Sequence, residues 1–286
     1  MNAAARDLSP PPAAEIEADV ADALAEDLGG GDVTADLLAD SADIAYLLCK
    51  EDAVICGRPW FDAVHRALDP QVEIDWKVAE GDRVAKGTVL ATLRGRSRAL
   101  VSAERASLNF LQTLSGTATV TAQYVAAVAG TGTRILDTRK TLPGLRLAQK
   151  YAVRIGGGQN QRLALWHGIL IKENHIAAAG GIAAVLANAQ ALDAGVDIQI
   201  EVESLDQLRE ALDAGATSVL LDNFDLPRMR EAVALTAGRA LLEVSGNVQL
   251  DQVRGIAETG VDRISIGRLT KDVRATDYSM RVLDRL

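Results

Sequence analysis

The sequence contains few aromatic residues, few cysteines and a minority of basic residues, and each shortage excludes a class of protein. Three Trp, four Tyr and three Phe occur in 286 residues, so a stacking surface for single-stranded nucleic acid is not expected. Lys and Arg number 30 against 39 Asp and Glu, which gives a formal net charge of −9. Because nucleic-acid surfaces neutralise phosphates with clustered Lys and Arg, we expect no nucleic-acid partner. A small anionic ligand needs only a local basic pocket and stays possible.

Two cysteines and the lack of a long apolar run bear on the compartment. Cys49 and Cys56 lack the close pairing of a zinc site and the dense, even set of a secreted disulfide scaffold, so both are predicted to be free, buried thiols. No stretch approaches the ~18 consecutive apolar residues of a membrane span. The first residues, MNAAARDLSPPPAAE, lack the apolar segment of a signal peptide. We therefore expect no membrane partner and a cytoplasmic location.

Hydrophobic patterning divides the chain into a lead-in and two domains. Residues 1–14, with three consecutive prolines, are predicted to be disordered. Residues 15–115 are predicted to form an α+β domain, and residues 116–286 a domain in which strands and helices alternate. In the first domain, helices are predicted at 15–28, 59–68 and 102–114, with short strands between residues 44 and 100.

After residue 133, short apolar runs recur, each followed by polar residues and a helical pattern. Unbroken apolar strands that alternate with amphipathic helices indicate a parallel sheet buried on both faces, hence an α/β fold. No GxGxxG follows the first run, which favours a βα barrel over a doubly wound sheet. The runs are ILD (135–137), ILIKEN (169–174), IQIEVE (198–203), SVLLDN (218–223), ALLEVS (240–245) and RISIG (263–267).

The polar residues that close these runs are the candidate functional groups, because active sites of βα barrels form at the C-terminal ends of the strands. They are Asp137, Thr138, Arg139, Lys140, Lys172, Glu173, Asn174, His175, Glu201, Asp222, Ser245, Gly246, Asn247, Gly267 and Arg268. For His175, a structural role at the strand end is the alternative to a catalytic one.

A basic stretch interrupts the acidic sequence. From Arg139 to Lys172 there are seven basic residues and no Asp or Glu, where average composition would place four or five acids. A solvated helix face is one explanation, because charge runs often have that origin. Arg139, Lys140 and Lys172 directly follow predicted strands, however, and a barrel would direct them to its mouth. We therefore favour an anion site.

Two carboxylates and two late loops complement this basic set. Glu201 and Asp222 close neighbouring runs, and hard oxygen ligands of this kind suit Mg²⁺. The alternative is that they cap helices or pair with Lys140 or Lys172. The loops at 245–247 (SGN) and 266–268 (IGR) offer backbone N–H groups for a phosphate. Together these features indicate a phosphorylated, multiply anionic substrate.

A set of motifs resembles the quinolinate phosphoribosyltransferase family and runs in the family's order from about residue 15 to the C-terminus. The motifs are EDLGGGDVT (26–34), ERASLNFLQTLSGTAT (104–119), DTRKTLPGLRLAQKYAV (137–153), GGGQNQR (156–162), LIKENHI (170–176), EVE (201–203), LLDN (220–223), EVSGN (243–247) and GVDRISIGRLT (260–270). The resemblance implies an incomplete parallel βα barrel of about seven strands, preceded by a sandwich-like α+β domain. It also implies transfer of a ribosyl phosphate from phosphoribosyl pyrophosphate to quinolinate, with decarboxylation to nicotinate mononucleotide.

The resemblance further implies roles for individual residues. Lys140, Glu201 and Asp222 would be catalytic, and the two carboxylates would hold Mg²⁺. Arg105 would reach the active site of the other subunit of a homodimer or of a dimer-based hexamer. The substrate-binding set would be Arg105, Thr138, Arg139, Lys140, Arg162, Lys172, Glu201, Asp222, Ser245, Gly246, Asn247, Ile266, Gly267, Arg268 and Lys271, with Arg139, Arg162 and Lys172 on the carboxylates of quinolinate.

Three positions depart from the family pattern. Gln161 replaces the histidine of GGGxNHR, His167 stands where the family has the aspartate of LxD, and Lys271 replaces the histidine of LTH. Gln161 can donate a hydrogen bond but carries no charge, which should weaken its hold on a carboxylate. We expect the site to stay competent because Arg139, Arg162 and Lys172 carry the charge.

Three other functions compete with this hypothesis. A relative acting on nicotinate or another acceptor would share the fold. An aldolase would use Lys140 or Lys172 to form a Schiff base. The string VAEGDRVAKGTVLATL (78–93) resembles biotinyl and lipoyl carrier domains, but the region about 20 residues upstream, where those carriers display their modified lysine, contains none.

Overall fold

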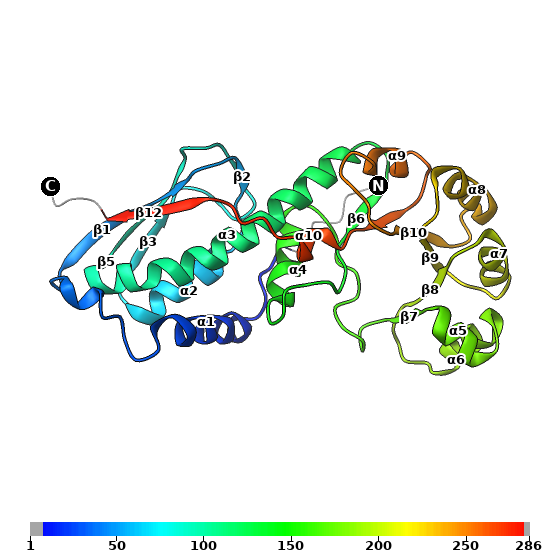
Figure 1. The fold of residues 1–286 in the computed structure, drawn as a ribbon, viewed down its shortest axis with the longest axis horizontal. Coiled ribbons are helices and arrows are strands. Elements are labelled where there is room, and N and C mark those ends of the chain that lie inside the picture. Colours follow the sequence, from blue (N-terminus) through cyan, green and yellow to red (C-terminus); the bar gives the residue numbers. More distant parts are fainter. Residues whose placement is uncertain (1–7, 283–286) are drawn as a thin grey trace. The chain divides into compact units, whose positions relative to one another are not determined.

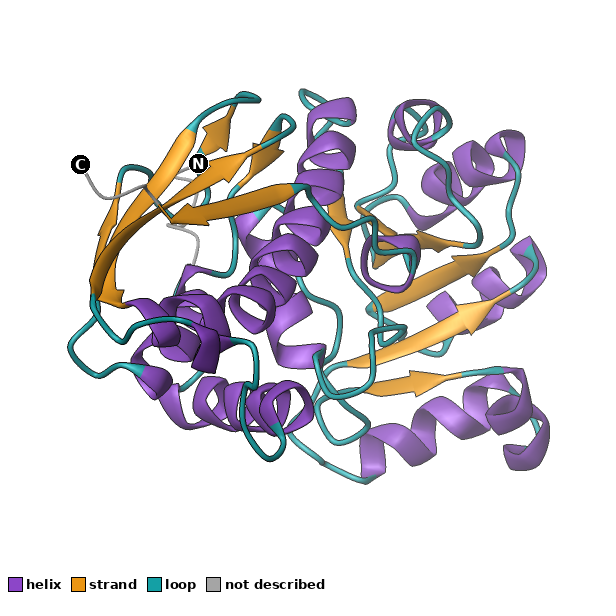
Figure 2. Cartoon of the chain, turned by 60° about the vertical axis from the view of Figure 1, so that its left-hand side comes forward, coloured by secondary structure: helices purple, strands orange, loops and turns teal. Residues whose placement is uncertain are grey.

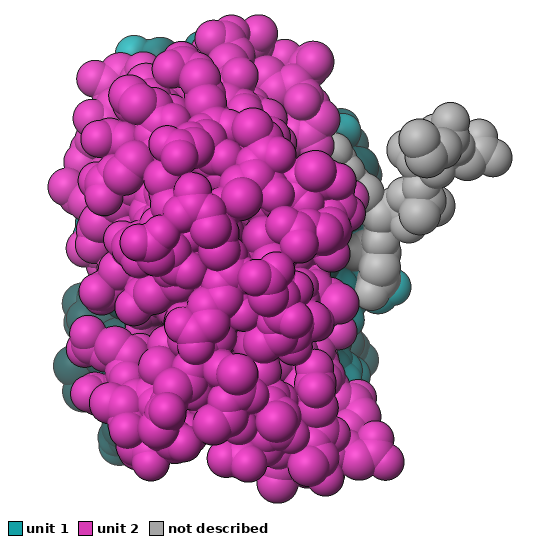
Figure 3. Space-filling model, turned by 90° about the vertical axis from the view of Figure 1, so that its right-hand side faces the viewer, with its two compact units in different colours: residues 1–122, 142–157, 272–286 teal, residues 123–141, 158–271 magenta. Residues whose placement is uncertain are grey.

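The computed structural model describes residues 8–282, which fall into two compact units that interleave along the sequence. Unit 1 consists of residues 1–122, 142–157 and 272–286, and unit 2 of residues 123–141 and 158–271 (Figure 3). The first seven residues of the predicted lead-in lie outside the described part of the chain. The domain boundary predicted at residue 115 stays a prediction.

Unit 1 is built on an antiparallel sheet of four strands in the order β12-β1-β5-β3, with a separate two-stranded ladder of β2 and β4. The predicted helices and strands of residues 15–100 are confirmed. The elements are α1 (Ala13–Leu28), a 3-10 turn (Ala35–Leu37), β1 (Ala42–Cys49), β2 (Ala53–Val54), α2 (Arg58–Leu68), β3 (Glu73–Trp76), β4 (Arg83–Val84), β5 (Val89–Arg96), α3 (Ser97–Ala127), α4 (Arg146–Ile155) and β12 (Tyr278–Val282).

The core of unit 1 follows from alternation along β1. Ala45, Leu47 and Cys49 are fully buried, because alternate side chains of a strand point to the same face. Both cysteines are free and buried, as predicted. Helix α3 continues well past the predicted end at residue 114, through Gly116. A Cβ at Gly116 would overlap the backbone carbonyl oxygen of Arg274, so this glycine permits a close backbone approach and does not end the helix.

Unit 2 is built on a parallel sheet of six strands in the order β6-β11-β10-β9-β8-β7. Helices α5 to α9 lie along one face of this sheet (Figures 1 and 2). All six strands fall on the predicted runs. The elements are β6 (Arg134–Leu136), β7 (Ile169–Ile171), α5 (Glu173–Ala179), α6 (Ile182–Ala191), β8 (Ile198–Val202), α7 (Leu205–Asp213), β9 (Ser218–Asp222), α8 (Leu226–Thr236), β10 (Leu241–Ser245), α9 (Val253–Ala257), β11 (Arg263–Ser265) and α10 (Arg268–Lys271).

The barrel is incomplete, because β6 and β7 are both edge strands. Within the described residues the sheet has six strands, where the resemblance implied about seven. The place beside β6 is taken by an irregular segment at Gln159, which forms one isolated parallel bridge with Leu136. The Gln159 N–H donates to the Ile135 carbonyl at 2.8 Å, and the Asp137 N–H donates to the Gln159 carbonyl at 3.1 Å.

The two faces of the parallel sheet differ in polarity. Ile200, Val219 and Val244 point toward the same face and are fully or almost fully buried. On the opposite face the register places Glu201 and Glu243 beside Leu220, and Asp222 beside Ser245. The face opposite Ile200, Val219 and Val244 therefore presents acids and a hydroxyl. The candidate site lies on this face. No helix within residues 8–282 is long and apolar enough to cross a membrane.

Candidate functional site

The predicted site residues of unit 2 gather at one edge of the parallel sheet. Lys140 follows β6, Lys172 follows β7, Glu201 is the second-last residue of β8, and Asp222 and Ser245 end β9 and β10. Because the strands are parallel, their carboxyl ends share this edge. Arg105 is the exception, since it is exposed on α3 in unit 1.

The basic stretch of residues 139–172 is divided between the two units. Arg146, Lys150 and Arg154 lie on α4 of unit 1, whereas Arg139, Lys140, Arg162 and Lys172 belong to unit 2. Helix α4 is not a solvated face, because Lys150 is only 3% exposed and most of its neighbours are buried. The four residues in unit 2 are the ones that the sequence placed in an anion site.

Glu201 and Lys172 form an ion pair across neighbouring strands. Lys172 Nζ lies 3.1 Å from Glu201 Oε2, with half of the lysine side chain exposed. This ion pair is one of the alternatives to metal binding that the sequence left open. The Glu201 side chain is only 15% exposed, so water reaches this ion pair mainly from the lysine side. An ion pair with one exposed partner adds little stability, so the Lys172 ammonium can exchange its partner for an anionic substrate.

The second alternative, helix capping by Glu201 and Asp222, is wrong. The hydroxyl of Ser204 accepts the Gln207 N–H at 3.2 Å and caps α7, and Asp225 accepts the Arg228 N–H at 2.9 Å and caps α8. Asp222 instead accepts a hydrogen bond from Asn223 Nδ2 at 3.0 Å. His175 makes a structural contact, because its Nδ1 accepts the Lys172 N–H at 3.0 Å at the start of α5.

Near the end of β6, the guanidinium groups of Arg139 and Arg162 are close enough for the charge of one to act on the other. Burial, and then the charge of Arg139, lower the pKa of Arg162. Arg162 is held in place by a hydrogen bond of 2.9 Å from its Nη1 to the Gly168 carbonyl. Two neighbouring cations that repel each other are stabilised by an anion that bridges them, and planar guanidinium groups bind carboxylates through paired hydrogen bonds.

The backbone at Gly267 passes close to the Lys140 side chain. A Cβ at Gly267 would lie 3.0 Å from Lys140 Cδ. The Lys140 N–H donates to Thr138 Oγ1 at 3.0 Å, and the Lys140 carbonyl accepts from Thr270 Oγ1 at 2.8 Å. These contacts join the segment after β6 to the turn after β11, where Ile266 is buried and α10 carries Arg268 and Lys271.

The loop after β10 forms a turn with two consecutive exposed residues at positive φ. Gly246 has a φ of +115° and Asn247 a φ of +39°, so consecutive N–H groups can turn toward one point. A Cβ at Gly246 would lie 2.5 Å from Asn223 Oδ1. Arg268 Nη1 donates to Gln249 Oε1, which ties α10 to the segment that follows this loop.

Sequence patterns missed a buried polar group below this edge. Glu243 is 1% exposed and Gln199 is 7% exposed, and both bond to Gln161. Asp137 is fully buried and accepts from Asn160 Nδ2 at 2.6 Å and from the Gln161 N–H at 2.8 Å. Strict alternation along β10 places Glu243 on the same face as Ser245, a signal that could have identified it.

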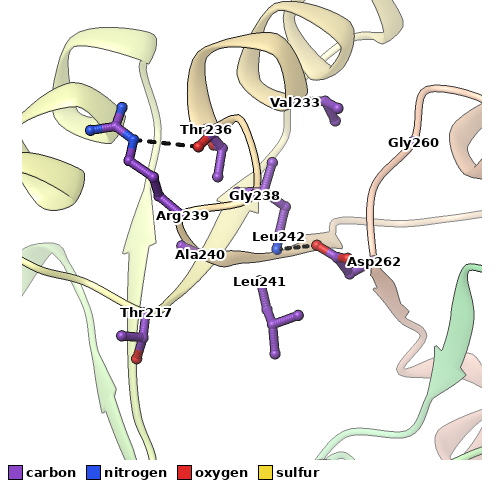
Figure 4. A pocket seen from close by; sticks show the side chains of 10 residues that line it. All are labelled: Thr217, Val233, Thr236, Gly238, Arg239, Ala240, Leu241, Leu242, Gly260 and Asp262. Carbon is purple, nitrogen blue, oxygen red and sulfur yellow. Dashed lines mark hydrogen bonds between the residues drawn. The ribbon is translucent and has the colours of Figure 1, made fainter.

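A cavity of about 290 Å³ lies at the other edge of the sheet (Figure 4). Thr217, Leu241 and Asp262 line it, and they precede or begin β9, β10 and β11. Arg239 Nε donates to the Thr236 carbonyl at 3.4 Å, and the Leu242 N–H donates to Asp262 at 2.8 Å. Its position at the amino ends of the strands separates it from all the predicted site residues.

The carboxylates at the carboxyl ends of β8 and β9 fit a magnesium ion better than a metal whose ligands all come from the protein. Within residues 8–282 no group of three His, Cys, Asp or Glu could enclose a metal. Mg²⁺ is commonly held by one or two carboxylates and completes its shell with water and substrate phosphates. Glu201 and Asp222, on neighbouring strands and both facing the site, meet that requirement.

Comparisons with known proteins agree over most of the chain. Family models described as quinolinate phosphoribosyl transferase match residues 32–115 (N-terminal domain) and 117–281 (C-terminal domain). A mitochondrial quinolinate phosphoribosyltransferase of Nicotiana tabacum is 40% identical over 91% of this chain and 80% of its own length. A probable nicotinate-nucleotide pyrophosphorylase of Bacillus subtilis is 40% identical over 90% of each chain. The structure of the nicotinate-nucleotide pyrophosphorylase of Francisella tularensis superimposes with a TM-score of 0.94, at 42% identity over 96% of this chain and 99% of its own.

Proposed function

This chain belongs to the quinolinate phosphoribosyltransferase family, and on that premise we propose that it makes nicotinate mononucleotide for NAD biosynthesis. It transfers a ribosyl phosphate from phosphoribosyl pyrophosphate to the ring nitrogen of quinolinate and releases pyrophosphate and CO2. The observation that supports this proposal is the arrangement of one edge of the parallel sheet, where Arg139 follows β6 and Lys172 follows β7, beside Glu201. A substrate with two neighbouring carboxylates matches these cations together with Arg162, whose pKa is lowered by burial and then by the charge of Arg139.

Arg139, Arg162 and Lys172 hold the two carboxylates of quinolinate. Each guanidinium presents a planar set of donors to one carboxylate. Lys172 follows the end of β7, and its ammonium bonds to the carboxylate of Glu201. When quinolinate binds, a carboxylate of the substrate replaces that of Glu201 as its partner. The acceptor ring is thereby oriented with its nitrogen toward the ribose.

The phosphoribosyl donor occupies the carboxyl ends of β8 to β11 and the segment after β6. Ser245, Gly246 and Asn247 hold the 5′-phosphate through backbone N–H groups, as the positive φ angles of this loop favour. The turn after β11 completes this pocket with Ile266, Gly267 and Arg268, and Lys271 adds a second cation beside it. Thr138 and Lys140 lie next to this turn and contact the pyrophosphate.

The chemistry needs charge stabilisation and geometry, with no side-chain nucleophile. Cleavage at the ribose C1 leaves positive charge on the sugar and negative charge on the pyrophosphate. Glu201 and Asp222 stabilise the sugar and orient its hydroxyls, and Lys140 neutralises the leaving group. The same two carboxylates would hold Mg²⁺, which supplies electrostatic stabilisation of the pyrophosphate when bound. The ring nitrogen of quinolinate forms the new bond to C1 and becomes cationic. This charge favours loss of CO2 from the quinolinate nucleotide, which gives nicotinate mononucleotide.

Subunit arrangement and location complete the proposal. Arg105, exposed on α3, reaches the active site of a second subunit in a homodimer or a dimer-based hexamer. The two free, buried cysteines support a reducing, cytoplasmic location.

One assay tests the reaction. The protein is incubated with phosphoribosyl pyrophosphate and either quinolinate or nicotinate, with Mg²⁺ or with chelator, and CO2 and pyrophosphate are measured. We expect both products from quinolinate with Mg²⁺ and neither with chelator. Product from nicotinate alone would refute the proposed substrate.

A mixing experiment tests the shared site. Arg105→Ala and Asp222→Ala each remove a residue that acts in a different subunit, so each variant alone is inactive. After the two are unfolded and refolded together, mixed dimers contain one intact site, and about a quarter of the wild-type activity should return if the chains pair at random. No recovery would show that Arg105 acts within its own subunit.

A further inference from the structure

Gln161 is enclosed by acceptors that leave its amide nitrogen no hydrogen for a substrate. Its Nε2 lies 2.9 Å from both carboxylate oxygens of Glu243 and 3.0 Å from Gln199 Oε1. A primary amide carries two hydrogens, and three acceptors already compete for them. The opposite amide orientation would place Gln161 Oε1 against the carboxylate, so the contacts with Glu243 fix the orientation.

The other end of the same amide holds the backbone of the anion site. Gln161 Oε1 accepts the N–H of Arg162 at 2.8 Å. The Gln161 N–H is bonded to the fully buried Asp137 at 2.8 Å. The loop that presents the Arg162 guanidinium is therefore tied to two strands of the sheet, through Asp137 after β6 and through Glu243 on β10.

Glu243 is a buried carboxylate that depends on amides. It is 1% exposed, and within the described residues its hydrogen-bond donors are Gln161 and Gln199, the latter donating from Nε2 at 3.0 Å. No cation within residues 8–282 pairs with it. A buried acceptor that loses its donor retains its desolvation cost, so the network resists rearrangement.

We propose that Gln161 is a positioning residue, which connects the buried carboxylate of Glu243 to the backbone of Arg162 and so fixes the guanidinium that receives a quinolinate carboxylate. This inference rests on the proposed function. It corrects the expectation that Gln161 holds the substrate weakly itself. Gln161, Gln199 and Glu243 form one network, called here the amide network, and it contains no cationic side chain.

The first test is a substitution that removes the hydrogen bonds and keeps the shape. Gln161→Met should raise the KM for quinolinate roughly tenfold or more, the range for a lost hydrogen bond to a charged group. The KM for phosphoribosyl pyrophosphate should change less than about twofold, because its predicted contacts lie on other segments. Gln190→Met makes the same change at an exposed position on α6 and should alter neither constant.

The second test moves the charge across the network. Gln161→Glu places two carboxylates in contact and should abolish measurable saturation by quinolinate. Adding Glu243→Gln restores one carboxylate and two amides, with a carboxylate oxygen still available to the Arg162 N–H. The double variant should recover a quinolinate KM within about tenfold of wild type, a rescue that mere loss of folding would not give.

The outcomes separate the two proposals. A wild-type protein that does not turn over quinolinate refutes the proposed function itself. An active wild type in which Gln161→Met leaves the quinolinate KM unchanged, or raises both KM values equally, refutes the amide network alone. An active wild type with no rescue in the double variant refutes it as well.

Discussion

Replacing Gly246 by alanine tests the assignment of the loop after β10 to the substrate phosphate. Gly246 has a φ of +115°, a conformation that L side chains rarely adopt. An added Cβ would also lie 2.5 Å from Asn223 Oδ1 and 3.5 Å from the Asn223 N–H nitrogen. Because Asn223 Nδ2 donates to Asp222, displacement of this side chain disturbs the candidate metal ligand as well.

The magnitude follows from the backbone strain. A non-glycine residue held in such a conformation costs about 1 to 3 kcal/mol. If the loop relaxes to a conformation without positive φ, that free energy is lost from binding of the phosphate. The KM for phosphoribosyl pyrophosphate should then rise about five-fold to 150-fold, at about 1.4 kcal/mol for each factor of ten. Steady-state kinetics in which each substrate is varied in turn measure this rise, and the KM for quinolinate should change little.

The control is a glycine with similar strain outside the site. Gly215 has a φ of +83° and no atom within 4 Å of an added Cβ, and it lies between α7 and β9 at the other edge of the sheet. Gly215→Ala should lower the free energy of unfolding by about 1 kcal/mol and leave both KM values unchanged. Equal kinetic constants in Gly246→Ala and Gly215→Ala would show that the loop after β10 does not bind the phosphate.

Three further changes test stability and the site. Burial lowers the pKa of His65 to about 4 from the ordinary 6.5, so the unfolded chain binds the proton first as the pH falls. The free energy of unfolding should therefore drop by about 3 kcal/mol between pH 6.5 and 4. Denaturant unfolding measures this drop, and His65→Leu should lack it. Gly116→Ala should lower the free energy of unfolding by about 1 to 3 kcal/mol, seen as a lower Tm, because its Cβ meets the Arg274 carbonyl; an unchanged Tm would contradict the close approach. Gln161→His should leave kcat/KM no higher than wild type, since other residues carry the charge, and recovery of activity from an inactive parent would refute that expectation.

Local patterns predicted the elements that depend on local periodicity. The spacing of Ile16 and Val20 predicted the helix at 15–28, and both residues are buried in α1. The six apolar runs after residue 133 are the six strands of the parallel sheet, because short apolar runs between helical patterns indicate parallel strands whatever their partners are. The candidate residues at their ends followed from the parallel direction alone.

Features that depend on distant contacts were not predicted. The helix predicted at 102–114 continues through Gly116 to Ala127. The backbone carbonyl of Arg274, far along the chain, leaves no room for a side chain at residue 116. Strand β12 pairs with β1 across more than two hundred residues, and no local signal marks such a pairing. The bonds from Gln161 to Glu243 were missed for the same reason, since they join a loop to a strand 82 positions away.

The buried acids explain how an acidic chain can build a site for anions. Asp137 and Glu243 both bond to Gln161, the residue before Arg162, yet both are almost fully buried. Each uses its oxygens to hold the loop that carries Arg162, Asp137 through Asn160 and a backbone N–H and Glu243 through amide side chains. If a guanidinium paired with Glu243, the site would lose a cation that the substrate needs. Amide donors satisfy this carboxylate without consuming positive charge, and that is the physical reason to expect a neutral residue at position 161 to be compatible with catalysis.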